Sequence, residues 1–269
     1  MKRVRLLNIE ISNVTLKEVL QNLQSGIVFT PNVDHLMKLQ SDQEFFQVYK
    51  IADYVLCDSQ IIKYAARFLG ISIPEKIAGS DFFPAFYNYH KHNQEIKIFL
   101  LGGLNGVAAQ AQDRINKKLG INMIVDSYSP SWGFENDKQE CQKIVEMINL
   151  SQATVLAIGV GAPKQEKWIY KYRNQLPNIK IFLAIGATID FEAGHVKRAP
   201  KWMREVGLEW LHRLISEPRR LWKRYLLEDI PFFWLILKEK LNLYQTPFPK
   251  MQISDLCEIK KERLDDIAF

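Results

Sequence analysis

Runs of mostly apolar residues alternate with amphipathic helical patterns over the first three quarters of the chain. Each run ends in a turn of small or polar residues, and apolar positions spaced three and four apart follow it. Short apolar runs without polar alternation are typical of strands that are buried on both faces of a parallel sheet. After one short strand at the N-terminus, the predicted strands are 27–29, 54–57, 96–101, 123–125, 154–158 and 179–185.

Helical patterns separate these strands, at 15–24, from about 33, at 61–69, up to 119, at 137–149 and at 164–174. The alternation predicts a doubly wound, mostly parallel α/β sheet of the Rossmann-like kind, which we place in residues 1–197. Ligands of such sheets bind at the carboxyl ends of the strands. Because the turns after the strands lie at that edge, we expect these residues to be neighbours: Thr30, Asp58, Gly102, Gly161 and Gly186.

From Pro200 onward the pattern predicts helices only. One helix should be interrupted at Glu217-Pro218, and another opens at Asp229-Ile230-Pro231. We expect residues 198–243 to form a helical appendage and residues 244–269 to form a loosely held tail.

The positive charge of the protein is concentrated in one segment. Residues 197–224 contain nine basic and three acidic residues, and the resulting charge of +6 equals the formal net charge of the whole chain. Three of the six tryptophans, Trp202, Trp210 and Trp222, lie among these cations. A cationic and aromatic segment on an otherwise neutral protein indicates an anionic partner, which is a phosphate group, a nucleic acid or a membrane surface.

The composition excludes several classes of protein. Three cysteines are too few for a disulfide framework or a zinc site, which favours a reducing compartment. The N-terminal residues lack the apolar run of a signal peptide, and no segment approaches the ~20 apolar residues that span a bilayer, so we expect at most a peripheral membrane protein. The five histidines do not cluster at ligand spacing, and we expect no metal site.

Two features of the predicted edge carry candidate chemistry. Asp58 follows an apolar strand, a position that suits a general base, although Asp58 or Ser59 would also serve as a helix N-cap. The turns at Gly102-Gly103 and at Gly159-Val160-Gly161 can bring backbone N–H groups to phosphate, or can be tight turns and nothing more. Neither matches the dinucleotide fingerprint, which disfavours a nicotinamide enzyme.

The helix after Gly161 places two polar residues in its first turn. Glu166 complements the helix dipole, whereas the amide of Gln165 is expected to bind a polar group or to face water. If a diphosphate is handled at this edge, arginines of the basic segment can neutralise it, and the candidates are Arg198, Arg213, Arg220 and Arg224.

Several blocks of the chain, in order, resemble one family. They are Thr30-Pro31-Asn32, Asp58, Gly79-Ser80-Asp81, IGVGAPKQEKWI, GATIDFEAGHVKRAPKWM and GLEWLHRLISEPRRLWKRYL. Together they resemble the WecG/TagA/CpsF glycosyltransferases (glycosyltransferase family 26) over roughly residues 8–243.

The resemblance implies an inverting, metal-independent transfer of a sugar, of the N-acetylmannosamine type or a related hexose, from a nucleotide diphosphate that is usually UDP. No cofactor is implied besides the UDP-sugar donor. The acceptor would be a lipid-linked sugar on a polyprenyl diphosphate, used in cell-surface polysaccharide synthesis. We accordingly expect a cytoplasmic enzyme, peripherally associated with the inner face of the plasma membrane, with no nucleic-acid partner; self-association stays open.

The resemblance also implies roles for individual residues. Asp58 matches the aspartate expected to be the general base, and Lys76 stands where the family usually has an arginine, so that the charge is kept and the bidentate fork is lost. The substrate-binding residues that we expect are Thr30, Asn32, Lys76, Gly79, Asp81, Gly102, Gly103, Gly161, Gln165, Glu166, Arg198, Arg213, Arg220 and Arg224.

A second class of function competes with this one. A non-catalytic α/β protein could use the basic C-terminal helices to bind nucleic acid or an acidic membrane, with strong sensitivity to salt. The glycine turns, Asp58 and Gln165 at one edge are more than such a platform requires, which favours the transferase.

Overall fold

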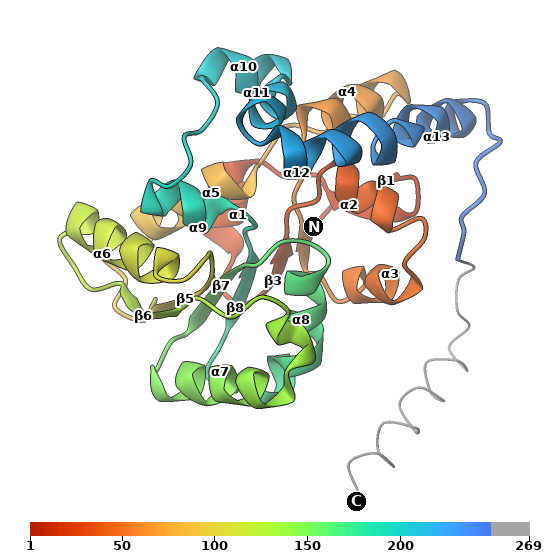
Figure 1. The fold of residues 1–269 in the computed structure, drawn as a ribbon. Coiled ribbons are helices and arrows are strands. Elements are labelled where there is room, and N and C mark those ends of the chain that lie inside the picture. The colour runs from red at the N-terminus through yellow and green to blue at the C-terminus, as the bar shows by residue number, and fades with distance from the viewer. Residues whose placement is uncertain (249–269) are drawn as a thin grey trace, which may run out of the picture.

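The computed structural model describes residues 1–248, and its centre is a six-stranded sheet in which all neighbouring strands are parallel. The spatial order of the strands is β4-β3-β8-β7-β5-β6 (Figure 1). Their bounds are β3 Gly26–Phe29, β4 Tyr54–Val55, β5 Ile98–Gly102, β6 Ile124–Tyr128, β7 Val155–Gly159 and β8 Ile181–Ala184.

Helices cover both faces of this sheet, because successive strand residues point to opposite sides. In β5, for example, Leu100 packs into one apolar core and Leu101 into the other. The first face carries α1 (Leu16–Asn22), α5 (Gly79–Tyr89), α6 (Val107–Leu119) and α9 (Thr188–Ala193). The second face carries α2 (Val33–Lys38), α3 (Gln43–Tyr49), α7 (Lys138–Leu150) and α8 (Lys164–Tyr172). The doubly wound fold predicted from the sequence is confirmed.

A β-hairpin at the N-terminus, of which the sequence pattern predicted only one strand, extends the fold beyond β4. It consists of β1 (Arg3–Leu6) and β2 (Ile9–Ser12), and Ser12 Oγ accepts a hydrogen bond of 3.0 Å from the N–H group of Val55. Its turn contains Leu7 at φ 52° instead of the Asn-Gly pair that marks such hairpins. The turn is held from a distance, because Glu239 Oε2 accepts from the Leu7 N–H group at 2.8 Å.

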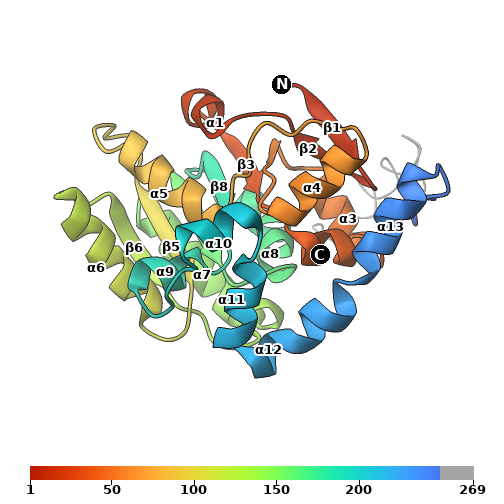
Figure 2. The same cartoon turned by 90° about the horizontal axis from the view of Figure 1, so that it is seen from above.

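The C-terminal helices lie over the carboxyl ends of the strands, as the two views in Figures 1 and 2 show. The first predicted helix is two helices, because Gly207 adopts a left-handed conformation (φ 85°) that ends the first. The helices are α10 (Lys201–Val206), α11 (Glu209–Ser216), α12 (Pro218–Lys223), a π-helical turn (Arg224–Glu228) and α13 (Pro231–Lys240).

Helix α13 returns to the body of the protein. Its Phe232 and Ile236 are buried in the core that also contains α4 (Gln60–Phe68). The segment expected to be a loosely held tail begins with two contacts: Tyr244 donates a 2.7 Å hydrogen bond to Gln40, and the rings of Phe248 and Phe46 are 5.5 Å apart. The remainder of that segment, residues 249–269, lies outside the described residues.

Candidate active site

The turns after β3 and β4 bring Thr30 and Asp58 to the same edge of the sheet. The Asp58 N–H group donates to the carbonyl of Pro31 at 3.0 Å, and Thr30 Oγ1 donates to the carbonyl of Ala184 at 3.1 Å. The start of α5 meets them, because the Gly79 N–H group donates to Asp58 Oδ2 at 3.4 Å. Residues from four separate stretches of sequence therefore converge on one point.

Gly79 allows this convergence. A Cβ atom at this position would lie 3.1 Å from the carbonyl oxygen of Ile185 and 3.3 Å from Thr30 Oγ1, closer than most side chains tolerate. The absence of a side chain lets the first turn of α5 approach β8 and place its N–H group beside the Asp58 carboxylate.

Asp58 is a half-buried carboxylate with an unusual proton affinity. It does not cap the following helix, since the Ser59 side chain caps α4. Burial raises the pKa of Asp58 to about 8; the charge of Glu209 raises it further, while Lys76 and the hydrogen bond from Gly79 oppose the shift. A carboxylate that gains and loses its proton near neutral pH suits a general base.

A second region of the same sheet edge lies between β5 and β7, where the order in which the strands are added reverses. The chain leaves β5 toward β6 on one side and leaves β7 toward β8 on the other, so β5 and β7 flank a topological switch point. Gly102 and Gly159 end these two strands, and a Cβ atom on Gly102 would collide with the Gly159 carbonyl oxygen. Gly103 and Gly161 follow with positive φ angles of 69° and 85°. Bare backbone therefore lines the switch point.

A loop after β6 borders this switch point and presents a residue that the sequence reasoning missed. Ser129 Oγ donates to the carbonyl of Gly102 at 3.1 Å, and Trp132, three residues further on, is 93% exposed. The ammonium group of Lys164, the first residue of α8, lies 4.8 Å from the centre of the indole ring and forms an ion pair with Glu135. The signal that could have found Trp132 is its position in a Ser-Pro-Ser-Trp-Gly turn directly after a strand.

Gln165 and Glu166 lie behind the edge and not on its surface. The Gln165 amide is 2% exposed, and it accepts from the Gly186 N–H group at 3.2 Å and donates to Glu166 Oε1 at 2.8 Å. The Glu166 side chain has no exposed surface, and its carboxylate faces His35 at 3.3 Å. In this arrangement Gln165 finds polar partners within the protein, and Glu166 accepts a hydrogen bond from Gln165.

Asp81, in the first turn of α5, binds two arginines of the basic segment. Arg198 and Arg204 donate to Asp81 Oδ1 at 2.9 and 3.1 Å. Burial alone would raise the pKa of the Asp81 carboxyl group, but the hydrogen bond and charge of Arg198, with the charges of Lys76 and Arg204, hold that pKa below its usual value. Asp81 thus orients two cations, of which Arg198 was expected from the sequence and Arg204 was not.

Lys76 forms an ion pair with Glu209, whose charge acts on Asp58. Its ammonium group lies 3.9 Å from Glu209 Oε2, and the Lys76 side chain is 14% exposed. Glu209, on α11, was not expected from the sequence. The pair brings the C-terminal helices to the part of the sheet edge that contains Asp58.

Arg224 connects the C-terminal helices to α2. Its guanidinium group donates to Asn32 Oδ1 at 3.2 Å and lies 3.4 Å from Asp34 Oδ2 and 4.0 Å from Asp229 Oδ2. Burial raises the pKa of Asp229 to about 6, although the charge of Arg224 opposes the shift. Arg224 therefore lies where the appendage meets the turn that contains Asn32.

The two remaining expected arginines give less information. Arg213, on α11, is half-buried, and its Nε atom has no hydrogen-bond partner among residues 1–248. Arg220 belongs to α12, and its side chain lies outside the described part of the structure.

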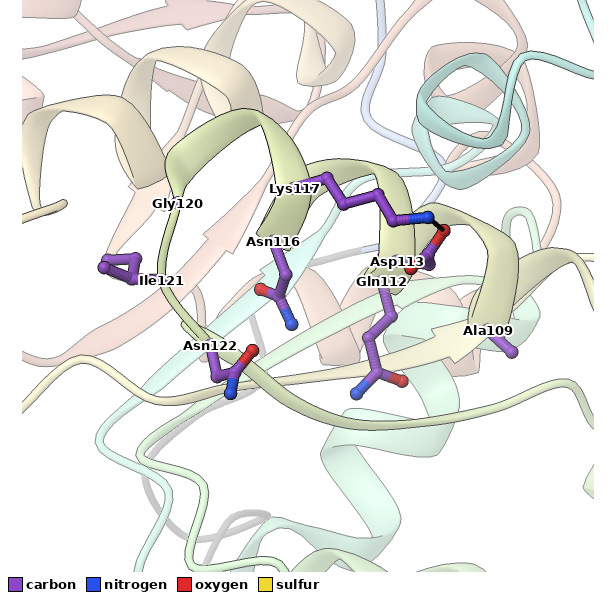
Figure 3. Close-up of a pocket in the computed structure, with 8 residues that line it drawn as sticks. All are labelled: Ala109, Gln112, Asp113, Asn116, Lys117, Gly120, Ile121 and Asn122. Atoms are coloured by element: carbon purple, nitrogen blue, oxygen red, sulfur yellow. Dashed lines mark hydrogen bonds and ion pairs between the residues drawn. The ribbon is translucent and has the colours of Figure 1, made fainter.

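A shallow hollow on the outer side of α6 lies at the opposite edge of the sheet, where β6 begins (Figure 3). Two of its side chains, Gln112 and Asn116, donate to the carbonyl of Ile124 and so hold the start of β6. The hollow contains none of the residues that meet at Asp58, and its polar groups have a structural use.

Two properties of the described chain bear on its partners. Among residues 1–248, no helix is both long enough and apolar enough to cross a membrane. Within the same residues, no group of three or more His, Cys, Asp and Glu side chains is arranged to hold a metal ion.

The family assignment follows from sequence comparison. A model of the Glycosyl transferase WecG/TagA/CpsF family matches residues 4–246. This range contains the whole sheet, the edge at Asp58 and the switch point, and all of the C-terminal helices through α13. The chain therefore belongs to the WecG/TagA/CpsF family of glycosyltransferases.

Proposed function

We propose that this glycosyltransferase moves a hexose, of the N-acetylmannosamine type or a related one, from a UDP-sugar to a lipid-linked sugar acceptor, with inversion at the anomeric carbon. The observation that carries the proposal is Asp58: a half-buried carboxylate at the carboxyl edge of the sheet, with its pKa raised to about 8. A structural carboxylate needs no such environment, whereas a base that operates near neutral pH benefits from it.

The proposed reaction is a single displacement. An acceptor hydroxyl oxygen forms a bond to the anomeric carbon of the donor while its proton passes to the Asp58 carboxylate. The bond between that carbon and the diphosphate oxygen breaks on the opposite face, and UDP leaves with the bonding electron pair. The Gly79 N–H group, 3.4 Å from Asp58 Oδ2, keeps the carboxylate in place as its charge changes.

The donor nucleotide is proposed to lie at the switch point between β5 and β7. Three features support this location. The turns at Gly102-Gly103 and at Gly161 present bare backbone, which phosphate oxygens can approach. Trp132 offers one exposed face of an indole ring that a nucleobase can stack on, while Lys164 occupies the other face.

The negative charge of the leaving diphosphate is proposed to be balanced by side chains of the appendage. Arg198 has two buried guanidinium nitrogens, Nε and Nη2, that have no hydrogen-bond partner within residues 1–248. Asp81 fixes the third nitrogen, so the group is oriented while most of its donors stay available. Lys76 and Arg213 supply further positive charge on the same side.

The acceptor is proposed to reach the site from the inner face of the plasma membrane. The last helices expose several large apolar side chains that a soluble surface does not require. Trp222 is 50% exposed, Ile230 54%, Phe233 59% and Trp234 59%, and Lys223 and Lys238 lie among them. Apolar side chains flanked by lysines are typical of segments that dip into an anionic interface.

The experiment that tests the proposal measures release of UDP. The full-length protein is incubated with a panel of nucleotide sugars, with and without a polyprenyl-diphosphate-linked sugar, in EDTA. We expect UDP release with one donor, dependent on the acceptor and resistant to EDTA. Absence of turnover with every donor, together with salt-sensitive binding to nucleic acid, would instead support the non-catalytic alternative.

A further inference from the structure

A buried polar chain lies beneath the proposed active site and has no part in the displacement described above. It runs from Glu166 on α8, through His35 on α2, to Asn32 at the start of α2, and ends at Arg224 of the appendage. Glu166 and His35 are 0% and 7% exposed. Burying polar groups without hydrogen-bond partners costs free energy. The positions of the protons in this chain can therefore be inferred from which atoms face each other.

The side-chain oxygen of Asn32 fixes the first proton. Asn32 Oδ1 accepts a hydrogen bond from the backbone N–H group of His35 at 3.3 Å and another from Arg224 Nη2 at 3.2 Å. Because both partners are donors, the Asn32 atom at this position must be the oxygen. The same oxygen lies 2.8 Å from His35 Nδ1. Nδ1 must therefore carry a proton that it donates to Asn32 Oδ1. The backbone N–H group of Asn32 also approaches Nδ1, but at 3.4 Å this contact is weaker than the one at 2.8 Å.

The carboxylate of Glu166 fixes the second proton. His35 Nε2 is buried and lies 3.3 Å from Glu166 Oε1, the oxygen that also accepts from Gln165; this contact is an ion-pair approach, and Nε2 has no hydrogen-bond partner within residues 1–248. Two lone pairs facing each other at this distance would repel, whereas an N–H group facing a carboxylate is attracted. A proton on both ring nitrogens gives Asn32 a donor at Nδ1 and places a positive charge opposite the Glu166 carboxylate.

The other charged groups around the ring are paired with one another. Asp34 precedes His35 on α2, and its carboxylate binds Lys38 at 2.7 Å and Arg224 at 3.4 Å. The Tyr49 ring, on α3, lies 6.5 Å from the His35 ring, and its buried hydroxyl group has no hydrogen-bond partner within residues 1–248. Burial, and next the charge of Glu166, raise the pKa of Tyr49, so its hydroxyl stays neutral. Lys38 and Arg224 are the other cations of the set; Asp34 binds both of them, and Asn32 separates Arg224 from the ring.

We propose that His35 is a positioning residue whose doubly protonated ring joins the buried Glu166 carboxylate to Asn32 and thereby couples α8 to Arg224 of the C-terminal appendage. The coupling reaches the reaction centre through the backbone, because the carbonyl of Pro31, next to Asn32, accepts the Asp58 N–H group. Lys38 reinforces the link, since it binds Asp34 and also donates to the carbonyl of Ala162 at 3.4 Å. The catalytic part of this inference rests on the proposed function; the proton positions do not.

Nitrogen-15 NMR of histidine-labelled full-length protein tests the proton positions. His35 is assigned by the signals that disappear in His35→Phe, or that shift in Glu166→Gln if the first variant does not fold. We expect a bonded proton on both ring nitrogens at pH 7 in the wild type, and on one nitrogen in Glu166→Gln, which keeps the shape but lacks the balancing charge. An unprotonated nitrogen in the wild type, or an unchanged spectrum in Glu166→Gln, overturns the inference.

A double-mutant cycle on kcat tests the coupling. His35→Phe and Arg224→Ala are each expected to lower kcat by about tenfold or more, and the double variant should be no worse than the more severe single one. Effects that multiply would mean that His35 acts independently of Arg224, as a structural residue would. The matched control is His90→Phe, which makes the same change at a half-buried histidine after α5 and should leave kcat unaltered.

Limited proteolysis separates failure of this inference from failure of the proposed function. His35→Phe and Arg224→Ala should expose the same cleavage sites between α11 and α13, and His90→Phe should not. If the wild type transfers no sugar but both variants release the appendage, the coupling stands and the assigned reaction is wrong. Equal resistance of His35→Phe and wild type contradicts the coupling whatever the activity.

Discussion

The N–H group that opens α5, at Gly79, donates to the carboxylate of Asp58, 21 residues earlier in the chain, at 3.4 Å. The charge of Lys76 favours the charged form of Asp58 most, and this hydrogen bond favours it next. Burial and Glu209 act in the other direction and prevail, because the pKa is raised to about 8. The proposed base is thus held in a geometry that tolerates both of its protonation states.

Asp58→Asn should abolish transfer while leaving donor binding intact. The amide keeps the size of the side chain and a contact to Gly79, but it cannot accept the proton of the acceptor. Loss of a general base costs about 10²–10⁴-fold in kcat. Turnover measured by UDP release, beside calorimetric titration with UDP, checks both parts. Full activity in this variant would exclude Asp58 as the base.

The rate of the wild type should rise with pH across the neutral range. Because the pKa of Asp58 is about 8, only a minority of molecules carry the ionised base at pH 7. kcat/KM should therefore increase by roughly tenfold per unit well below pH 8 and level off above it. A profile of kcat/KM between pH 5.5 and 9.5 tests this, and a flat profile contradicts it.

The same carboxylate should make the protein less stable at alkaline pH. The folded state retains the Asp58 proton up to about pH 8, whereas an unfolded aspartate, with a model value of 3.8, has already lost it. Unfolding is thus progressively favoured as pH rises from about 4 to 8, by at most about 1.4 kcal/mol per unit.

Asp58→Asn lacks this penalty. Its free energy of unfolding should equal that of the wild type near pH 4 and exceed it at pH 8 by an amount on the order of a few kcal/mol. Urea denaturation at a series of pH values measures the difference. A difference that is constant with pH would show that Asp58 titrates normally in the folded protein.

Trp132→Ala should weaken nucleotide binding without unfolding the loop. The loop is anchored independently of the indole, since the N–H group of Ser131 and the hydroxyl of Tyr128 both donate to Glu140. Loss of one stacking contact costs about 1–3 kcal/mol, so the Kd for UDP should rise by about tenfold or more. Trp132→Phe should retain part of the affinity.

The matched control for Trp132 is Tyr89→Ala, which removes an aromatic side chain that is 53% exposed at the far end of α5. Its Kd for UDP should equal that of the wild type. Titrations followed by calorimetry give both values. If Trp132→Ala binds UDP as tightly as Tyr89→Ala, the nucleobase lies elsewhere.

Replacing Phe233 and Trp234 together by serine should reduce binding to vesicles that contain anionic lipid. Both side chains are 59% exposed on α13, whereas the core contact of that helix is made by Phe232 and Ile236. Co-sedimentation with vesicles should fall by about tenfold, while turnover on a short-chain soluble acceptor is kept. Leu150→Ser, at a leucine that is 83% exposed on α7, should bind vesicles like the wild type.

The sequence predicted the sheet well because its strands are continuous apolar runs, and all six lie within a few residues of their predicted bounds. It also placed Thr30 and Asp58 at one edge, because parallel topology fixes which ends of the strands meet. It did not predict α5, which begins at a glycine without a side-chain cap and contains Pro84. Glycine and proline both disfavour a helix, so the local sequence does not indicate α5, whose position depends on contacts with β8.

Side-chain partners within the site were beyond the reach of local pattern. Glu166 has the spacing of an exposed acid at a helix start, and only the fold shows that His35, 131 residues earlier, lies behind it. Arg204 and Glu209 are two of many charges in a basic segment, and their roles depend on how α10 and α11 turn at Gly207. Long-range pairing of charges has no sequence period, so it cannot be derived from one.

The hydrogen bond and ion pair between Arg224 and α2 predict which chimeras of this enzyme with its relatives can fold. Asn32 and Asp34 bind that guanidinium group, so the α/β domain and the C-terminal helices must carry matching residues at this contact. An appendage grafted from another enzyme onto this body should dock only if it presents an arginine at the same place. A chimera that exchanges the C-terminal helices should therefore exchange the first turn of α2 with them.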